Sequence, residues 1–256
     1  MTPINEHTRI AHLLNLAETD EGAFRSAINE STAEELEEFS RESYRIYPNR
    51  SWPLIVCAQA LSRRNSDDVV ARIMKIALLM EPVNFHAIVN YARALHLTGR
   101  YSEIASHIDK YLPREDAQEQ ALLLYHKANV LFDMGQTEEA ILLATEAYNT
   151  YAESDEVTFI YGYALYMQKK YDAALVYYNK ALSLDPEMIS ALIYTALLYI
   201  DCRDFTNALN TIRKLSEFKT EYFADLIEFP QFEQLLASEQ GAEVRELFQQ
   251  KGVLLG

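Results

Sequence analysis

The sequence predicts an all-α fold, a solenoid of stacked helix–turn–helix units. The first observation is an internal repeat: LHLTGRYSEIASHIDKYL from Leu95 resembles LYMQKKYDAALVYYNKAL from Leu165, with leucine, tyrosine, lysine and leucine at matching places. The second is the scarcity of turn-forming residues, since 256 residues contain only seven glycines and seven prolines. A β-sandwich or barrel needs many such turns, whereas long helices with short connections do not.

Alignment along the chain places five repeats at a spacing of 34 residues, with one two-residue insertion near Arg114–Gln120. The repeats start at Ser51, Phe85, Ala121, Asp155 and Ile189. The eighth position of each repeat is small, namely Ala58, Ala92, Ala128, Gly162 and Ala196. The twentieth position is small in the last three repeats but is Val70 and Ile104 in the first two, which predicts wider helix crossings there. Small side chains let two helix backbones approach closely.

This pattern resembles the tetratricopeptide-repeat family, whose unit is a 34-residue helix–turn–helix. Turn glycines at Gly99 and Gly135 and helix-ending prolines at Pro82 and Pro186 fall in the same phase as the small residues. The resemblance covers about two thirds of the chain and implies a right-handed α-solenoid. One unit cannot bury its apolar face alone, so stacked units share a core and the terminal units need caps.

The two ends of the chain are expected to be these caps. Residues 1–50 are predicted to form an N-terminal helical cap with a degenerate repeat, in which Ser31 or Thr32 caps a helix that Pro48 ends. Residues 51–222 hold the five repeats, and residues 223–256 are expected to form two or three C-terminal capping helices. Because no Ser/Pro-rich linker or charge block divides the chain, the sequence predicts one continuous solenoid.

Charge and composition exclude several classes of function. The formal net charge of -15 would repel nucleic acid and anionic lipid, so the expected partner is a protein or peptide of basic character. No apolar stretch is long enough to span a membrane, and the N-terminus lacks the pattern of a signal peptide. Cys57 and Cys202 lie far apart in apolar patterns and are expected to be buried, reduced thiols. These features predict a cytoplasmic protein.

The sequence contains no pattern that indicates catalysis. A phosphate-binding glycine loop, an HExxH motif and a GxSxG motif are all absent from the sequence. His86 and His96 share a predicted helix nearly three turns apart, too far for one metal ion to bridge. The acidic run Glu34–Glu38 is typical of a solvated helix face. We therefore expect no enzyme activity, no cofactor and no metal site.

The family resemblance implies that the first helix of each repeat lines a concave wall that binds a partner. The residues at wall positions that we single out are Asn90, Arg93, His126, Asn129, Phe159, Tyr163, Tyr166 and Tyr194. In one subfamily, lysine, asparagine and arginine side chains bind the C-terminal carboxylate of chaperone tails. At the corresponding positions this sequence has other residues, namely Ile55, Gln59, Leu122 and His126, so we do not expect that mode of binding. The wall is instead polar in its first half and aromatic in its second.

The leading interpretation is a protein-interaction scaffold, or a chaperone-like adaptor, that holds a partner segment in a concave, partly aromatic groove. Phe159, Tyr163 and Tyr166 are spaced to share one helix face, and aromatic residues are common binding hot spots. Alternatively, a C-terminal helix or a second copy of the chain, in a homodimer, covers this face. A different class of function is an acidic inhibitor or immunity-type protein that blocks a basic toxin or nuclease.

Overall fold

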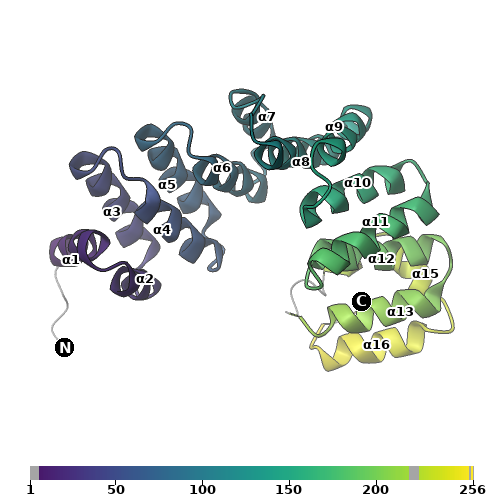
Figure 1. Cartoon of the computed structure of the whole chain (residues 1–256). Helices are drawn as coiled ribbons and strands as arrows, with labels where there is room; N and C mark the ends of the chain where they lie inside the picture. The colour runs from purple at the N-terminus through teal and green to yellow at the C-terminus, as the bar shows by residue number, and fades with distance from the viewer. Residues whose placement is uncertain (1–5, 219–224, 254, 256) are drawn as a thin grey trace. The chain divides into compact units, whose positions relative to one another are not determined.

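The computed structural model describes residues 6–218, 225–253 and 255, which form helices joined by short connections (Figure 1). Within these residues no strand occurs, so the predicted all-α solenoid class is confirmed. The chain divides into two compact units, Met1–Glu115 and Asp116–Gly256. Parts of three sequence predictions lie outside the described residues: the start of the N-terminal cap (1–5), the end of the last repeat (219–222) and the start of the C-terminal cap (223–224).

The first unit is a series of helices in which each packs on helices next to it, or next but one, in sequence. These are α1 (Glu6–Thr19), α2 (Glu21–Asn29), α3 (Ala33–Ile46), α4 (Trp52–Ser62), α5 (Asp67–Met80), α6 (Phe85–Leu97) and α7 (Tyr101–Asp109). Thr32 is the N-cap of α3 in a reciprocal capping box: its hydroxyl accepts from the Glu35 amide, and the Glu35 carboxylate accepts from the Thr32 amide. Of the two predicted caps, Thr32 therefore begins the helix.

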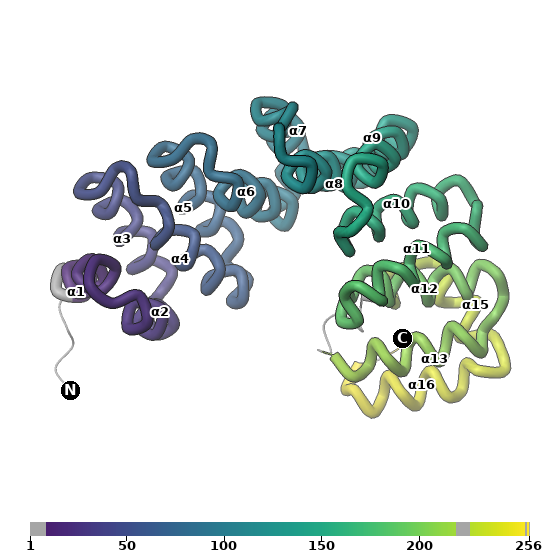
Figure 2. Tube along the Cα trace, viewed as in Figure 1, coloured from purple at the N-terminus to yellow at the C-terminus, as the bar shows by residue number. Residues whose placement is uncertain are grey.

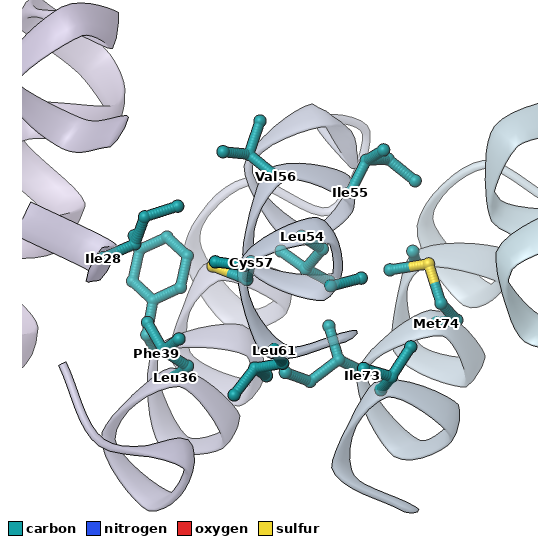
Figure 3. Close-up of a cluster of buried hydrophobic side chains, with 14 of the residues drawn as sticks. Ile28, Leu36, Phe39, Leu54, Ile55, Val56, Cys57, Leu61, Ile73 and Met74 are labelled. Carbon is teal, nitrogen blue, oxygen red and sulfur yellow. The ribbon is translucent and has the colours of Figure 1, made fainter. Parts of the chain in front are cut away.

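The core of the first unit lies between α2, α3, α4 and α5 (Figure 3). Phe39, Leu54, Leu61 and Ile73 are completely buried there. Helix α4 has buried residues on nearly all sides, because α2, α3, α5 and α6 all pack around it. This all-round burial explains the almost unbroken apolar sequence of α4, and it also buries the Cys57 thiol, whose pKa is raised by loss of solvent.

The boundary between the units coincides with the two-residue insertion that interrupts the repeat spacing. Helix α7 has nine residues, whereas α5, α9 and α11 have 14 each. After α7 the chain passes through a cis Leu112–Pro113 bond to α8, which begins at Ala117. The sequence predicted one continuous array because no linker composition marks this point. The boundary between the two units falls at a short helix and an irregular connection.

The second unit contains α8 (Ala117–Asp133), α9 (Thr137–Thr150), α10 (Asp155–Met167), α11 (Tyr171–Leu184), α12 (Ile189–Asp201) and α13 (Phe205–Leu215). They pair as α8–α9, α10–α11 and α12–α13 (Figure 2). Gly135 turns the chain between α8 and α9 with a φ of 72°, a conformation that favours glycine. The small residues Ala128, at the eighth repeat position, and Ala140 and Ala174, at the twentieth, are completely buried, as the repeat pattern requires.

The C-terminal segment closes the apolar end of the second unit. It comprises a 3₁₀ turn, η1 (Asp225–Glu228), and the helices α15 (Phe232–Leu236) and α16 (Gly241–Gln250). Phe232 and Phe248 are buried with their ring centroids 5.1 Å apart, in one core with residues of α12 and α13. The prediction for the second cysteine is wrong: Cys202 is exposed, because it follows the last residue of α12 and lies in the turn before α13.

Candidate partner-binding surface

Three aromatic rings from three successive helical hairpins form a continuous row, which we call the aromatic strip: Phe132 of α8, Tyr163 of α10 and Tyr194 of α12. The ring centroids of Phe132 and Tyr163 lie 4.7 Å apart, as do those of Tyr163 and Tyr194. All three side chains are half-buried. Edge-to-face and tilted contacts at this distance hold each ring in a fixed orientation. The strip is thus a rigid apolar surface that still reaches solvent.

The sequence places one strip residue in the first helix of each of these repeats. Phe132, Tyr163 and Tyr194 stand at the twelfth, ninth and sixth positions of repeats that start at Ala121, Asp155 and Ile189. The position moves by three residues, close to one helical turn, from each repeat to the next. The strip therefore crosses the three helices obliquely. Because the shift is regular, the three rings form a row although they occupy three different repeat positions.

A second layer of rings supports the strip from inside. Phe159 is only 4% exposed and Tyr178 is completely buried, with their ring centroids 5.7 Å apart. Tyr178 fits there because Gly162 has no side chain. A β-carbon at Gly162 would lie 2.9 Å from Cδ1 of the tyrosine ring. The glycine at the eighth repeat position thus makes room for the layer that holds Tyr163 and Tyr194 in place.

The strip carries no charge at neutral pH. Burial raises the pKa of Tyr163, and burial together with the neighbouring Tyr163 raises that of Tyr194. Burial also raises the pKa of Tyr166, whose hydroxyl donates a hydrogen bond to the Asp201 carboxylate. These tyrosines therefore stay protonated, and the strip offers apolar ring faces and neutral hydroxyls to a ligand.

The α12 end of the strip contacts the chain's own C-terminal segment. The ring of Phe229 lies edge-on to Tyr194, with centroids 6.0 Å apart, and the amide of Gln231 donates to the Tyr166 hydroxyl at 3.4 Å. The sequence analysis left covering of this face by a C-terminal helix as an alternative to partner binding. Here the contacts come from two residues that precede helix α15. The contact also shows that an aromatic side chain from outside the repeats fits against the strip.

The predicted binding residues fall into two groups. Phe159, Tyr163, Tyr166 and Tyr194 are brought together in the second unit, although Phe159 is buried beneath the surface rather than on it. His126 and Asn129 are half-buried on α8 of the same unit.

The other two predicted residues, Asn90 and Arg93, lie on α6 of the first unit. The amide of Asn90 donates to the His86 carbonyl of its own helix at 2.8 Å, and Arg93 is exposed. The structure thus joins the aromatic members of the predicted set into one cluster and places these two polar members in a different unit.

Sequence reasoning missed a separate aromatic cluster on α9, α10 and α11. Tyr148 and Tyr161 stack with centroids 4.5 Å apart, and Tyr177 packs edge-on against both. The ammonium of Lys180 donates to the Tyr148 hydroxyl at 3.0 Å and to the Ala152 carbonyl at 3.1 Å. The signal was the occurrence of Tyr161 and Tyr163 two positions apart on one helix, since side chains at that spacing face different neighbours.

Replacing Tyr178 with phenylalanine is expected to stabilise the protein by about 1–2 kcal/mol. The Tyr178 hydroxyl is buried and has no hydrogen-bond partner among the described residues, so folding desolvates it without compensation. Urea unfolding followed by circular dichroism measures the change. Tyr148→Phe is the matched control: it removes a hydroxyl that does accept a bond, from Lys180, and should destabilise slightly. A loss of stability in Tyr178→Phe would contradict the prediction.

Neither a metal centre nor a membrane span is evident in the described part of the chain. Among residues 6–218, 225–253 and 255, no three histidine, cysteine, aspartate or glutamate side chains gather where they would hold a metal ion. Over the same residues, none of the helices combines the length and the apolar character needed to cross a bilayer.

Comparisons with known proteins agree with the repeat pattern. The family model described as anaphase-promoting complex, cyclosome, subunit 3 matches residues 133–215, which is about a third of the chain. No curated protein sequence matches the chain.

Solved structures show similar folds at low identity. PilF of Pseudomonas aeruginosa is 16% identical with a TM-score of 0.55, and the match covers 83% of this chain and 90% of PilF. In the Cut9–Hcn1 hetero-tetramer of the APC/C, a chain 12% identical has a TM-score of 0.61 over 97% of this chain and 53% of its own length. Human IFIT1, a dimer with PPP-AAAA, is 13% identical with a TM-score of 0.63 over 96% of this chain and 58% of its own.

This chain thus spans little more than half the length of the last two proteins, and identities this low show the fold alone. The repeat spacing, the buried small residues, the paired helices and these structural matches lead to one conclusion: the chain has the tetratricopeptide-repeat fold.

Proposed function

We propose that the chain is a protein-interaction scaffold whose second unit holds a partner segment against the aromatic strip. The observation that carries the proposal is the contact of Phe229 with Tyr194. A ring supplied by a segment outside the repeats already packs against the strip. A partner's aromatic or large apolar side chain would use the same kind of contact farther along, at Tyr163 and Phe132.

Rigid aromatic surfaces favour binding because they lose little conformational freedom when a ligand arrives. The rings of the strip are fixed by their mutual contacts and by Phe159 and Tyr178 beneath them. Half-buried tyrosine at the centre of such a surface is typical of an interface hot spot. Tyr163 is central in the strip, since it contacts the rings on both sides of it.

Replacing Tyr163 with alanine is expected to weaken peptide binding by at least about tenfold. The probes are peptides selected from a random displayed library on the full chain, then labelled and measured by fluorescence anisotropy. Tyr161→Ala is the matched control, because Tyr161 is also a half-buried tyrosine of α10 but contacts Tyr148 and Tyr177 instead of the strip. We do not replace Tyr166, because its hydroxyl is hydrogen-bonded to Asp201 and Gln231 and its loss would also remove these contacts.

Equal affinity for the wild type and the Tyr163 variant would contradict binding at the strip, as would equal losses in both variants. Binding that ignores Tyr163 but falls steeply with added salt would favour the other interpretation, an acidic inhibitor of a basic partner, because screened surface charge would then carry the affinity.

A further inference from the structure

The first unit has a groove of its own, whereas the aromatic strip belongs to the second unit. The groove has a volume of about 510 Å³ and is lined by residues of α5, α6 and α7 and by the two residues after α7. This volume is in the range of sites that bind small molecules or a few side chains of a peptide. The groove is therefore large enough to be a binding site in its own right.

The groove runs along α7, which is a short helix. The second helices α5, α9 and α11 each have 14 residues, but α7 ends at Asp109 after nine. Leu79 of α5 is 61% exposed at the groove, and the half-buried Tyr111 stands at a repeat position that is alanine in three of the other four repeats. The groove thus adjoins the short helix that precedes the boundary between the two units.

Three aromatic rings that pack against one another form part of the groove lining. His107 lies edge-on to Tyr91 and to Tyr111, with ring centroids 4.8 and 5.1 Å apart. Its Nε2 lies 3.3 Å from the Ile88 carbonyl oxygen, which only accepts, so Nε2 carries the proton. Burial lowers the pKa of His107 to about 4, which leaves the ring neutral at pH 7. This part of the lining is aromatic and uncharged.

The charged residues of the groove favour an anion. Lys75 and Lys110 both line it. The acidic lining residue, Glu103, accepts two hydrogen bonds of 2.7 Å from the Arg100 guanidinium, which neutralises it. Charges farther than about 8 Å away are largely screened at physiological salt, so the local lysines outweigh the net charge of the whole chain. The groove is a locally positive, partly apolar surface on an acidic protein.

We propose that this groove binds a short acidic peptide segment of a partner protein that carries a large apolar side chain between its carboxylates. The apolar side chain would lie against Leu79 and the Tyr91 ring, and the flanking carboxylates would pair with Lys75 and Lys110. Charge complementarity selects this occupant, since a basic segment would bring like charges together at both lysines. The site is separate from the aromatic strip and does not depend on it.

The test uses synthetic peptides with a central leucine–phenylalanine pair, flanked by an increasing number of aspartates or, in a matched series, lysines. Fluorescence anisotropy with the full chain is expected to show affinity rising with each aspartate and no binding of the lysine series. Lys75→Gln with Lys110→Gln should weaken the most acidic peptide by at least about tenfold. Ser106→Trp, which fills the groove without changing its charge, should weaken binding as well.

Lys169→Gln with Lys170→Gln removes the same charge from an exposed turn of the second unit and should leave affinity unchanged. The proposal is overturned if no acidic peptide binds, if aspartates make no difference, or if both double variants weaken binding equally. Retained binding in Ser106→Trp would also overturn it, since the lysines would then act outside the groove. Circular dichroism verifies that each variant keeps its helices.

Discussion

Replacing Phe39 with alanine is expected to lower the free energy of unfolding of the first unit by about 4 kcal/mol. Phe39 is completely buried, and its ring centroid lies 5.4 Å from that of Phe24, which in turn packs edge-on against Trp52. These contacts join α2, α3 and α4 in one core. Truncation would leave a cavity that surrounding helices fill only in part, so the lost burial and the cavity both cost stability.

The single tryptophan makes this measurement specific to the first unit, because Trp52 belongs to the same core. Urea unfolding followed by its fluorescence should show a lower midpoint in Phe39→Ala. Tyr44→Ala on the same helix is the control, since Tyr44 is 40% exposed and its loss should change the free energy of unfolding little. An unchanged midpoint in Phe39→Ala would show that this core does not limit the stability of the unit.

Replacing Gly241 with alanine is expected to destabilise the second unit by about 3 kcal/mol, at the upper end of the usual cost of overpacking. A β-carbon there would lie 2.0 Å from the Leu236 carbonyl oxygen and 2.7 Å from its carbonyl carbon. These are backbone atoms at the end of α15, so no side-chain rotation relieves the overlap. Helix α16 would have to move, and it carries Val244 and Phe248 into the core.

Two measurements test this effect. Hydrogen exchange should show reduced protection of the α16 amides, and urea unfolding should show a lower free energy of unfolding. Gly22→Ala is the control, because a β-carbon there meets nothing closer than an Asp20 carboxylate oxygen at 3.5 Å. Alanine favours a helix by up to about 1 kcal/mol over glycine, so this control should be neutral or slightly stabilising. Unchanged exchange in Gly241→Ala would contradict the argument from backbone contact.

The fold was predictable because its determinants are local and repeated. The buried small residues Ala128, Ala174 and Ala208 recur in phase, and their burial follows directly from close helix crossing. Phe159, Tyr163 and Tyr166 were expected on one helix face, and they pack in one aromatic cluster. That grouping depends only on the spacing of the three residues along a helix, which can be read from a single sequence.

Features that depend on distant contacts were not predictable. Phe229 reaches Tyr194 through a non-repeating segment whose path no periodic pattern specifies. The burial of Phe159 beneath the strip depends on Tyr178, which in turn depends on the space above Gly162. The groove at Lys75 and Lys110 brings together residues of α5, α6 and α7, and the two residues after α7, from positions 75 to 111 of the sequence.

The packing of the helices on elements close to them in sequence also bears on how the chain folds during synthesis. Nearly all of the main helix contacts join elements that are next to each other, or next but one, along the chain. Folds with such short-range contacts form quickly, since little chain entropy is lost before each contact is made. The first unit holds a complete core within residues 1–115, so it can fold at the ribosome before the second has been translated.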